Sequence, residues 1–166
     1  MKKLCLLIFT FLFSFSIFSQ QEPTEPLYKR FPTPPPFQLL HTDSSTILTD
    51  KDMKKNKPVF IMIFSPDCDH CQHHAEEMVN KREQFKDIQI VMASTQSLAK
   101  VKEFYKTYQL DKLENLIIGQ DREYILGTYY KMKSLPFLAF YDKKGNLIDV
   151  FEGALPIDKV LDIFNK

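Results

Sequence analysis

Residues 58–71 read PVFIMIFSPDCDHC, and this segment carries the strongest structural signal in the chain. It begins with an unbroken apolar run, which is typical of a strand buried on both faces of a sheet. The polar turn Ser65-Pro66-Asp67 follows, and the apolar positions over 68–86 are then spaced like one face of a helix. The sequence therefore predicts that Cys68 and Cys71 lie where a buried strand meets the first turn of a helix.

This junction favours nucleophilic thiol chemistry at Cys68. The unpaired N–H groups and the positive dipole end of a helix N-terminus stabilise a thiolate, the nucleophilic form of cysteine. Cys71 lies one turn inside the helix, so we expect it to be more buried and to attack the mixed disulfide that Cys68 forms. We interpret the two residues as a catalytic pair that needs no metal and no cofactor beyond its own redox-active disulfide.

Three polar neighbours are candidates for tuning Cys68. An imidazolium at His70 favours the thiolate, because opposite charges attract. The carboxylates of Asp67 and Asp69 act in the opposite direction, because they disfavour a further negative charge. The balance between these effects depends on where the side chains lie.

Other uses of the cysteine pair fit the sequence less well. A purely structural disulfide across so short a loop restricts little unfolded-chain entropy. Copper or zinc could bind the cysteines together with His70, His73 or His74, but a zinc site normally draws on a second cysteine or histidine pair. We expect His73 and His74 to be solvated helix positions. A copper- or zinc-binding module (a metallochaperone) and a redox-inert partner domain are the alternative hypotheses to an enzyme.

Strands and helices alternate along the rest of the chain. The expected elements are a hairpin over 37–40 and 46–48, strands at 88–92 and 116–118, helices at 97–108 and 122–130, a hairpin over 137–141 and 147–151, and a last helix that starts at Pro156. The turn of the second hairpin contains Gly145, which can adopt a positive φ. This order predicts an α/β fold, a three-layer α/β/α sandwich with a mixed central sheet and an N-terminal β-hairpin extension.

The segment before residue 37 is expected to lie outside this domain. Lys2 and Lys3 precede an apolar stretch over 4–18, the layout of a secretory signal peptide. That stretch is short for a membrane span of about 20 apolar residues, so an uncleaved anchor is the less favoured alternative. Residues 20–36 are rich in proline and are expected to form a stiff linker. We therefore predict a signal peptide at 1–19, a linker at 20–36 and a domain at 37–166, exported to the periplasm.

Composition limits the functions that this domain can have. The chain has 166 residues, with 22 basic and 21 acidic residues and a formal charge of +1. Without residues 1–19 it keeps 20 basic residues against 21 acidic ones, and it loses Cys5. The full chain has 44% hydrophobic residues, which excludes a disordered polyelectrolyte, and it lacks the basic excess of a nucleic-acid-binding protein. We expect a monomer with no nucleic-acid partner.

Four features together resemble the thioredoxin fold, and most closely the exported TlpA-like thiol–disulfide oxidoreductases. They are the apolar strand followed by Cys68-Asp69-His70-Cys71, Ser134-Leu135-Pro136 before a strand, the turn at 142–146, and Gly153-Ala154 before the last helix. The resemblance covers residues 37–166. It implies exchange of a Cys68–Cys71 dithiol and disulfide with protein thiols and disulfides, for reduction or isomerisation, with a membrane-borne or soluble thiol as the electron partner.

The resemblance also implies roles for single residues. Cys68 is the attacking thiol and Cys71 the resolving thiol. Pro136 is a cis-proline that shapes the substrate groove, and Leu135 offers backbone groups to an extended peptide.

Three departures from the family pattern bear on the direction of electron flow. Asp67 stands where thioredoxins usually have Trp. Met62 stands where a buried acid helps thioredoxin to deprotonate its second cysteine. His70, directly before the second cysteine, is similar to the strongly oxidising DsbA type.

Overall fold

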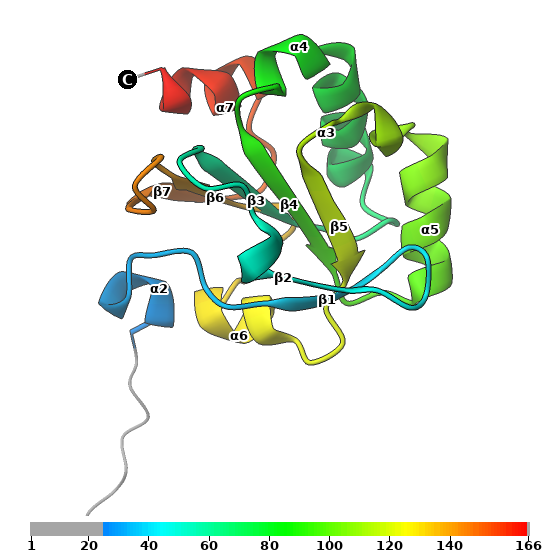
Figure 1. Cartoon of the computed structure of the whole chain (residues 1–166), viewed down its shortest axis with the longest axis horizontal. Helices are drawn as coiled ribbons and strands as arrows, with labels where there is room; N and C mark the ends of the chain where they lie inside the picture. Colours follow the sequence, from blue (N-terminus) through cyan, green and yellow to red (C-terminus); the bar gives the residue numbers. More distant parts are fainter. Residues whose placement is uncertain (1–24, 166) are drawn as a thin grey trace, which may run out of the picture.

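Seven strands form one mixed sheet in the computed structural model, which describes residues 25–165 (Figure 1). The strand order is β2-β1-β5-β4-β3-β6-β7. The strands are β1 (Gln38–His41), β2 (Ile47–Thr49), β3 (Val59–Ile63), β4 (Gln89–Ser94), β5 (Leu116–Gln120), β6 (Phe137–Tyr141) and β7 (Leu147–Glu152). β3, β4 and β5 are parallel, while the β1–β2 hairpin and β6–β7 pair antiparallel at the two sides. The predicted mixed sheet with an N-terminal hairpin is confirmed.

Helices cover both faces of this sheet (Figure 1). One face carries α3 (Asp69–Asn80), α4 (Arg82–Phe85), α5 (Leu98–Thr107) and α7 (Ile157–Phe164), and the other carries α2 (Leu27–Arg30) and α6 (Ile125–Tyr130). Two 3-10 turns, η2 (Asp50–Asp52) and η3 (Leu110–Lys112), lie in the connections. The predicted three-layer α/β/α sandwich is therefore confirmed. Within residues 25–165, no helix has the length and apolar character that a membrane span requires.

β3 lies at the centre of the core. Successive side chains of a strand point to opposite faces, so Phe60 and Met62 pack beneath α3 and α7 while Ile61 and Ile63 pack against the α6 side. Every residue of β3 is buried. The apolar run that predicted a two-sided buried strand is explained by this placement.

The helix predicted over 68–86 is divided in two. α3 ends at Asn80. Its C-cap residue Lys81 has a backbone (φ −105°, ψ 22°) outside the helical region, and its N–H donates to the carbonyls of Glu77 and Val79. α4 begins at Arg82 and adds the buried Phe85 to the core. The apolar spacing is shared by both helices, which is why the sequence predicted one.

The second half of the predicted linker lies against the domain rather than apart from it. The hydroxyl of Tyr129 donates to the carbonyls of Phe31 and Thr33, the second at 3.0 Å. The carbonyl of Pro32 accepts the N–H of Leu147 at 2.8 Å. The segment that includes α2 is thus fastened to the α6 side and to β7. The predicted signal peptide at 1–19 lies outside the described residues.

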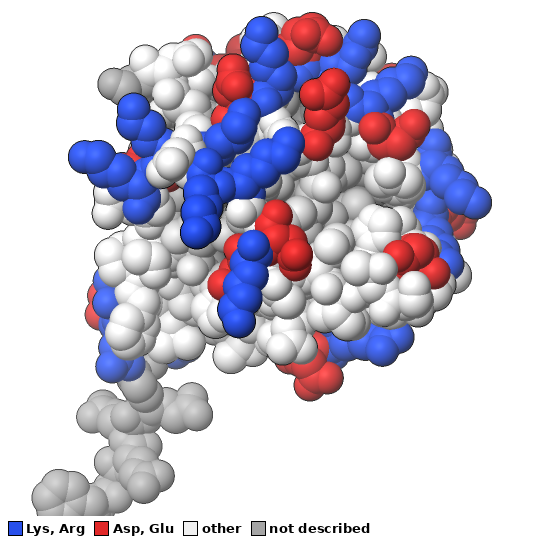
Figure 2. Space-filling view, in the orientation of Figure 1, with Lys and Arg blue, Asp and Glu red and all other residues white. Residues whose placement is uncertain are grey.

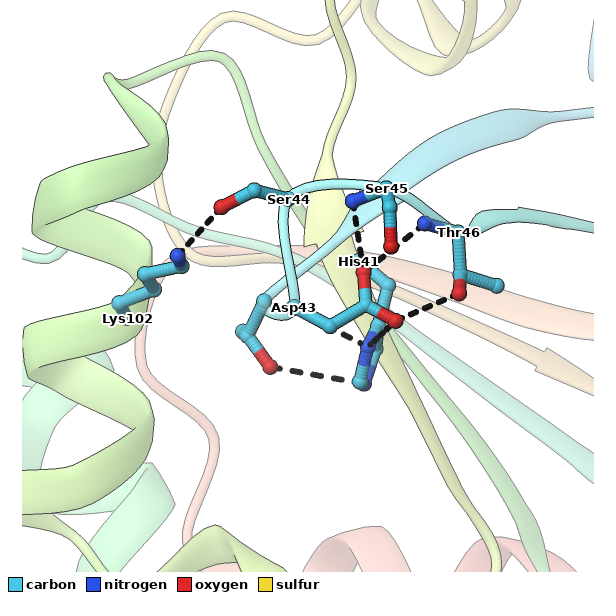
Figure 3. Close-up of polar contacts among 7 residues, drawn as sticks. His41, Asp43, Ser44, Ser45, Thr46 and Lys102 are labelled. Carbon is cyan, nitrogen blue, oxygen red and sulfur yellow. Dashed lines mark hydrogen bonds and ion pairs between the residues drawn. The ribbon is translucent and has the colours of Figure 1, made fainter.

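One carboxylate closes the β1–β2 turn (Figure 3). Asp43 accepts the N–H groups of Ser45 and Thr46 at 2.8 Å each, and the Thr46 hydroxyl at 2.5 Å. These hydrogen bonds, the one from the Thr46 hydroxyl foremost, hold the pKa of Asp43 well below its usual range. Lys102 of α5 donates to the Ser44 hydroxyl at 2.5 Å, so the N-terminal hairpin is also tied to α5.

Candidate active site

Cys68 is the N-cap residue of α3. Its backbone is extended (φ −99°, ψ 115°), and its Sγ accepts the N–H of Cys71 at 3.3 Å. Its own N–H donates to the carbonyl of Ser65 at 3.1 Å, and its carbonyl accepts the N–H of Gln72 at 3.0 Å. The loop after β3 therefore brings the sulfur onto the helix N-terminus, where a negative charge is favoured. This is the junction that the sequence predicted.

Cys71 differs from Cys68 in its burial. Cys71 has no exposed surface, whereas Cys68 is half-buried, and both thiols are free. Burial raises the pKa of the Cys71 thiol far above its ordinary value, and the hydrogen bond with the Cys68 side chain raises it further. Met62, which stands where thioredoxin has a buried acid, is buried on the same face of the sheet as Cys71, so this position is apolar here. One thiol is reachable, and the other is enclosed and holds its proton.

Pro136 lies at the same end of the sheet as Cys68. The Leu135–Pro136 peptide bond is cis, the form that the resemblance implies, and Pro136 is buried. The next residue, Phe137, pairs with Ile63, which ends β3. The segments that carry the cysteines and Pro136 therefore extend from adjacent ends of two neighbouring strands. Leu135 is half-buried and packs against the buried side chains on both faces of the sheet.

Glu152, at the end of β7, holds the segment before Pro136. Its carboxylate accepts the N–H groups of Lys133 and Ser134 and the Ser134 hydroxyl, each at 3.1 Å. The N–H of Gly153 donates to the carbonyl of Pro136 at 2.8 Å. Sequence reasoning missed Glu152, because its partners come 18 and 19 residues earlier in the chain.

The three predicted tuning residues are all exposed. Asp69 and His70 lie in the first turn of α3. The Asp67 carboxylate is 2.5 Å from the ammonium group of Lys100 on α5. Sequence reasoning also missed this lysine, which no local pattern links to Asp67. The ion pair directs the Asp67 carboxylate towards α5 and partly offsets its negative charge.

The histidines of α3 divide between solvent and core. His73 is exposed, as predicted. Its Nε2 lies 3.5 Å from the carboxylate of Glu77. The prediction for His74 is wrong, because this residue is only 3% exposed. It shares the inner stripe of α3 with Cys71 and Met78. His74 lies three residues after Cys71 and four before Met78, a spacing that indicates a position on the buried face of the helix. Because histidine is polar, the sequence predicted the solvated face instead.

Both ring nitrogens of His74 lie next to backbone carbonyls. Nε2 is 2.6 Å from the oxygen of Leu155, and Nδ1 is 3.0 Å from the oxygen of His70. Within residues 25–165, no three His, Cys, Asp or Glu side chains converge in a way that could hold a metal ion. The histidine nearest the middle of α3 is thus engaged with the backbone.

Lysines gather at the end of the sheet opposite Cys68. Near the start of β3, a hollow of about 390 Å³ is lined by charged side chains from the segment before β3 and from the β6–β7 turn, namely Lys51, Lys54, Lys55, Lys57, Lys143 and Lys144 with Asp50 and Asp142. Figure 2 shows basic side chains crowded on this part of the surface. A net charge near zero did not predict this concentration, because a sum carries no information about position.

The chain matches the model of one protein family, the thioredoxin-like domain, over residues 49–166. No curated protein matches it significantly.

Solved structures extend the likeness of fold to residues before 49. A secreted Mycobacterium tuberculosis disulfide oxidoreductase homologous to E. coli DsbE is 17% identical, with a TM-score of 0.64, covering 76% of this chain and 92% of its own. An exposed lipoprotein thioredoxin from Streptococcus pneumoniae is 24% identical, with a TM-score of 0.61 and coverages of 77% and 96%. Arabidopsis thaliana ScoI with copper bound is 17% identical, with a TM-score of 0.57 and coverages of 77% and 92%. At these identities the similarity concerns the fold.

Proposed function

The chain belongs to the thioredoxin-like domain family, and from this membership we propose that it is an exported thiol–disulfide oxidoreductase acting on protein substrates. The observation that carries the proposal is the inequality of its two cysteines. Cys68 is half-buried with its sulfur on a helix N-terminus, and Cys71 is enclosed one turn behind it. An accessible nucleophile with a protected second thiol is the arrangement that dithiol exchange requires.

The proposed reduction runs in two displacement steps. The Cys68 thiolate attacks one sulfur of a substrate disulfide, which forms a Cys68–substrate disulfide and releases the other substrate sulfur as a thiolate. Cys71 then gives up its proton and attacks Sγ of Cys68. This closes the Cys68–Cys71 disulfide and releases the second substrate thiolate. The substrate gains the electron pair and two protons that the dithiol loses, and the reverse sequence oxidises a substrate.

The segment at Leu135 and Pro136 is the proposed groove for the substrate chain. It leaves the sheet beside the cysteine loop, and Glu152 fixes its backbone. A substrate in extended conformation can pair with the backbone of Leu135, which keeps a disulfide near Cys68. We propose protein thiols and disulfides as the substrates and a membrane-borne or soluble thiol as the electron partner.

We also propose that the protein is exported, to the periplasm in a cell with two membranes. Residues 1–19 have the layout of a signal peptide, and an exported dithiol works where disulfides persist. The M. tuberculosis neighbour is secreted and the S. pneumoniae neighbour is an exposed lipoprotein. Cell fractionation of the full chain and of a form that starts at residue 20 tests export: a full chain retained in the cytoplasm contradicts it.

The metal-binding alternative has few ligands left to use. Both ring nitrogens of His74 lie beside backbone carbonyls and His73 lies beside Glu77, which leaves the exposed His70 to join the cysteines. Equilibrium dialysis with copper(I) and with zinc distinguishes the metal-binding hypothesis from the thiol–disulfide hypothesis. We expect no stoichiometric binding that depends on the cysteines.

Insulin reduction tests the proposed activity. We expect the wild type to reduce insulin with dithiothreitol as donor, and Cys68→Ser to lose this activity. Cys71→Ser should instead accumulate a mixed disulfide through Cys68, because the resolving thiol is absent. His73→Ser, an exposed change on the same helix, serves as the matched control. Equal activity of the wild type and Cys68→Ser would contradict the proposal, and a rapidly alkylated Cys68 would argue against a redox-inert domain.

The direction of electron flow follows from the reduction potential of the pair. A potential near the roughly −270 mV of thioredoxin favours a reductase, and one near roughly −120 mV favours an oxidant. Equilibration with glutathione or dithiothreitol buffers, followed by mass spectrometry of the alkylated thiols, measures it.

A further inference from the structure

His74 links the active-site helix to a distant segment of the chain. It is buried on α3, and its Nε2 lies 2.6 Å from the carbonyl oxygen of Leu155, which comes 81 residues later. A carbonyl oxygen only accepts, so Nε2 carries the proton and donates it. The imidazole is therefore a fixed bridge from α3 to the loop between β7 and α7.

The same loop also holds the proline of the proposed groove. Two residues before Leu155, the N–H of Gly153 donates to the carbonyl of Pro136 at 2.8 Å. Directly before Gly153, the Glu152 carboxylate accepts the N–H groups that precede Leu135. The short segment 152–155 thus contacts both parts of the site. Glu152 and Gly153 bond to the Pro136 segment, and the carbonyl of Leu155 accepts from His74 on α3.

The second nitrogen of His74 faces the backbone of α3 itself. Nδ1 lies 3.0 Å from the carbonyl oxygen of His70, one turn back towards Cys68. Both the Nε2–H tautomer and the imidazolium make the bond to Leu155, so the bridge exists in either form. Removing it leaves a carbonyl without its partner next to the helix that carries both cysteines.

We propose that His74 is a positioning residue that fixes Cys68 on α3 relative to the Pro136 segment, so that a disulfide held in a polypeptide chain reaches the thiol. The proposal rests on the proposed thiol–disulfide function. A small disulfide needs only to reach the sulfur of the half-buried Cys68. A disulfide within a polypeptide also needs that sulfur to be aligned with the groove that holds the chain. The two substrates therefore report separately on the thiol and on the alignment.

The test compares reaction rates of reduced protein with insulin and with dithiodipyridine, a small aromatic disulfide. His74→Leu keeps the volume and removes the donor, and we expect it to lower the insulin rate about tenfold with little change in the dithiodipyridine rate. His74→Gln can place an amide N–H where Nε2 stood, so it should restore most of the insulin rate. Met78→Ala, on the same buried stripe, controls for general destabilisation and should keep the wild-type ratio.

A readout independent of activity follows the link itself. In His74→Leu the amide of Gly153 should exchange its hydrogen about tenfold faster by NMR, because the loop has lost its tie to α3. If His74→Leu does not fold, His74→Asn replaces it, since its shorter amide does not reach Leu155 while that of Gln does.

The outcomes separate the two hypotheses. Three results overturn the positioning role. His74→Leu could keep the wild-type ratio of the insulin rate to the dithiodipyridine rate. His74→Gln could lose as much insulin rate as His74→Leu, or Met78→Ala could change the ratio as His74→Leu does. A wild type that reacts with neither disulfide overturns the proposed function instead. In that case the Gly153 amide still decides the bridge, since unchanged exchange in His74→Leu overturns it.

Discussion

Burial separates the chemistry of two cysteines that lie within one helical turn. Because desolvation raises the pKa of Cys71, little of it is thiolate at neutral pH. In Cys68→Ser, where the hydrogen bond between the two side chains changes but burial remains, we predict slow alkylation of Cys71 by iodoacetamide at pH 7. Its rate should still be rising beyond pH 9. A plateau near the ordinary cysteine pKa of about 8.5, measured by mass spectrometry, contradicts this prediction.

Asp43 stabilises the β1–β2 turn through its ionised carboxylate. Folding lowers its pKa, so its contribution is complete above the unfolded-state value of about 3.9 and disappears as the pH falls through the lower folded-state value. We predict that Asp43→Asn lowers the Tm at pH 7 and that the difference from the wild type shrinks below about pH 4. Thermal melts across this range measure it, and a difference independent of pH is the contrary result.

The functional residues that could be predicted from the sequence differ from those that could not in how far away their partners lie along the chain. Cys68 and Cys71 were recognisable because their chemistry depends on local spacing and on a helix start. His74, Glu152 and Lys100 act through partners far away in sequence, and a single sequence does not show which distant segments meet. The local half of the candidate site was therefore predictable, and its tertiary contacts were not.

At the scale of elements, α6 begins where a buried carboxylate captures its first amides. Asp121 accepts the N–H groups of Ile125 and Leu126, each at 3.0 Å, and this sets the start at Ile125 instead of the predicted 122. We predict that Asp121→Ala lowers the free energy of unfolding by about 0.5–2 kcal/mol, the usual range for losing a side chain that caps a helix start. Asp121→Asn, which keeps one oxygen acceptor, should lose less. Urea unfolding measures both, and an Ala variant as stable as the wild type contradicts the cap.

Strands were predicted better than helix ends for a physical reason. An unbroken apolar run predicted the two-sided burial of β3, and turn residues predicted the two hairpins. The break at Lys81 and the start of α6 depend on hydrogen bonds that form only in the folded chain. Element order and type were thus local information, while these boundaries were tertiary.

At the scale of the molecule, Tyr129 ties the segment around α2 to the domain. Replacing it with Phe removes the donor to Phe31 and Thr33 but keeps the ring in the core. We predict faster tryptic cleavage after Lys29 and Arg30, with a loss of global stability of only about 1 kcal/mol, the usual net value of a hydrogen bond. Limited proteolysis with a urea titration tests this. Tyr28→Phe is the matched control, and equal cleavage rates in both variants contradict the tie.

The lysine-lined hollow makes the charge distribution uneven although the net charge is near zero. Because salt screens exposed charges beyond about 10 Å at 0.1 M, a flat anionic surface responds to the nearest patch rather than to the total charge. We predict retention on a cation-exchange resin at pH 7 and about 0.1 M salt, and earlier elution for Lys143→Glu with Lys144→Glu. Lys106→Glu with Lys159→Glu changes the net charge equally away from the hollow and should elute later than the first double variant. Identical elution of the two double variants would mean that total charge governs binding. Insulin reduction should be the same in both, because the hollow and Cys68 lie at opposite ends of the sheet.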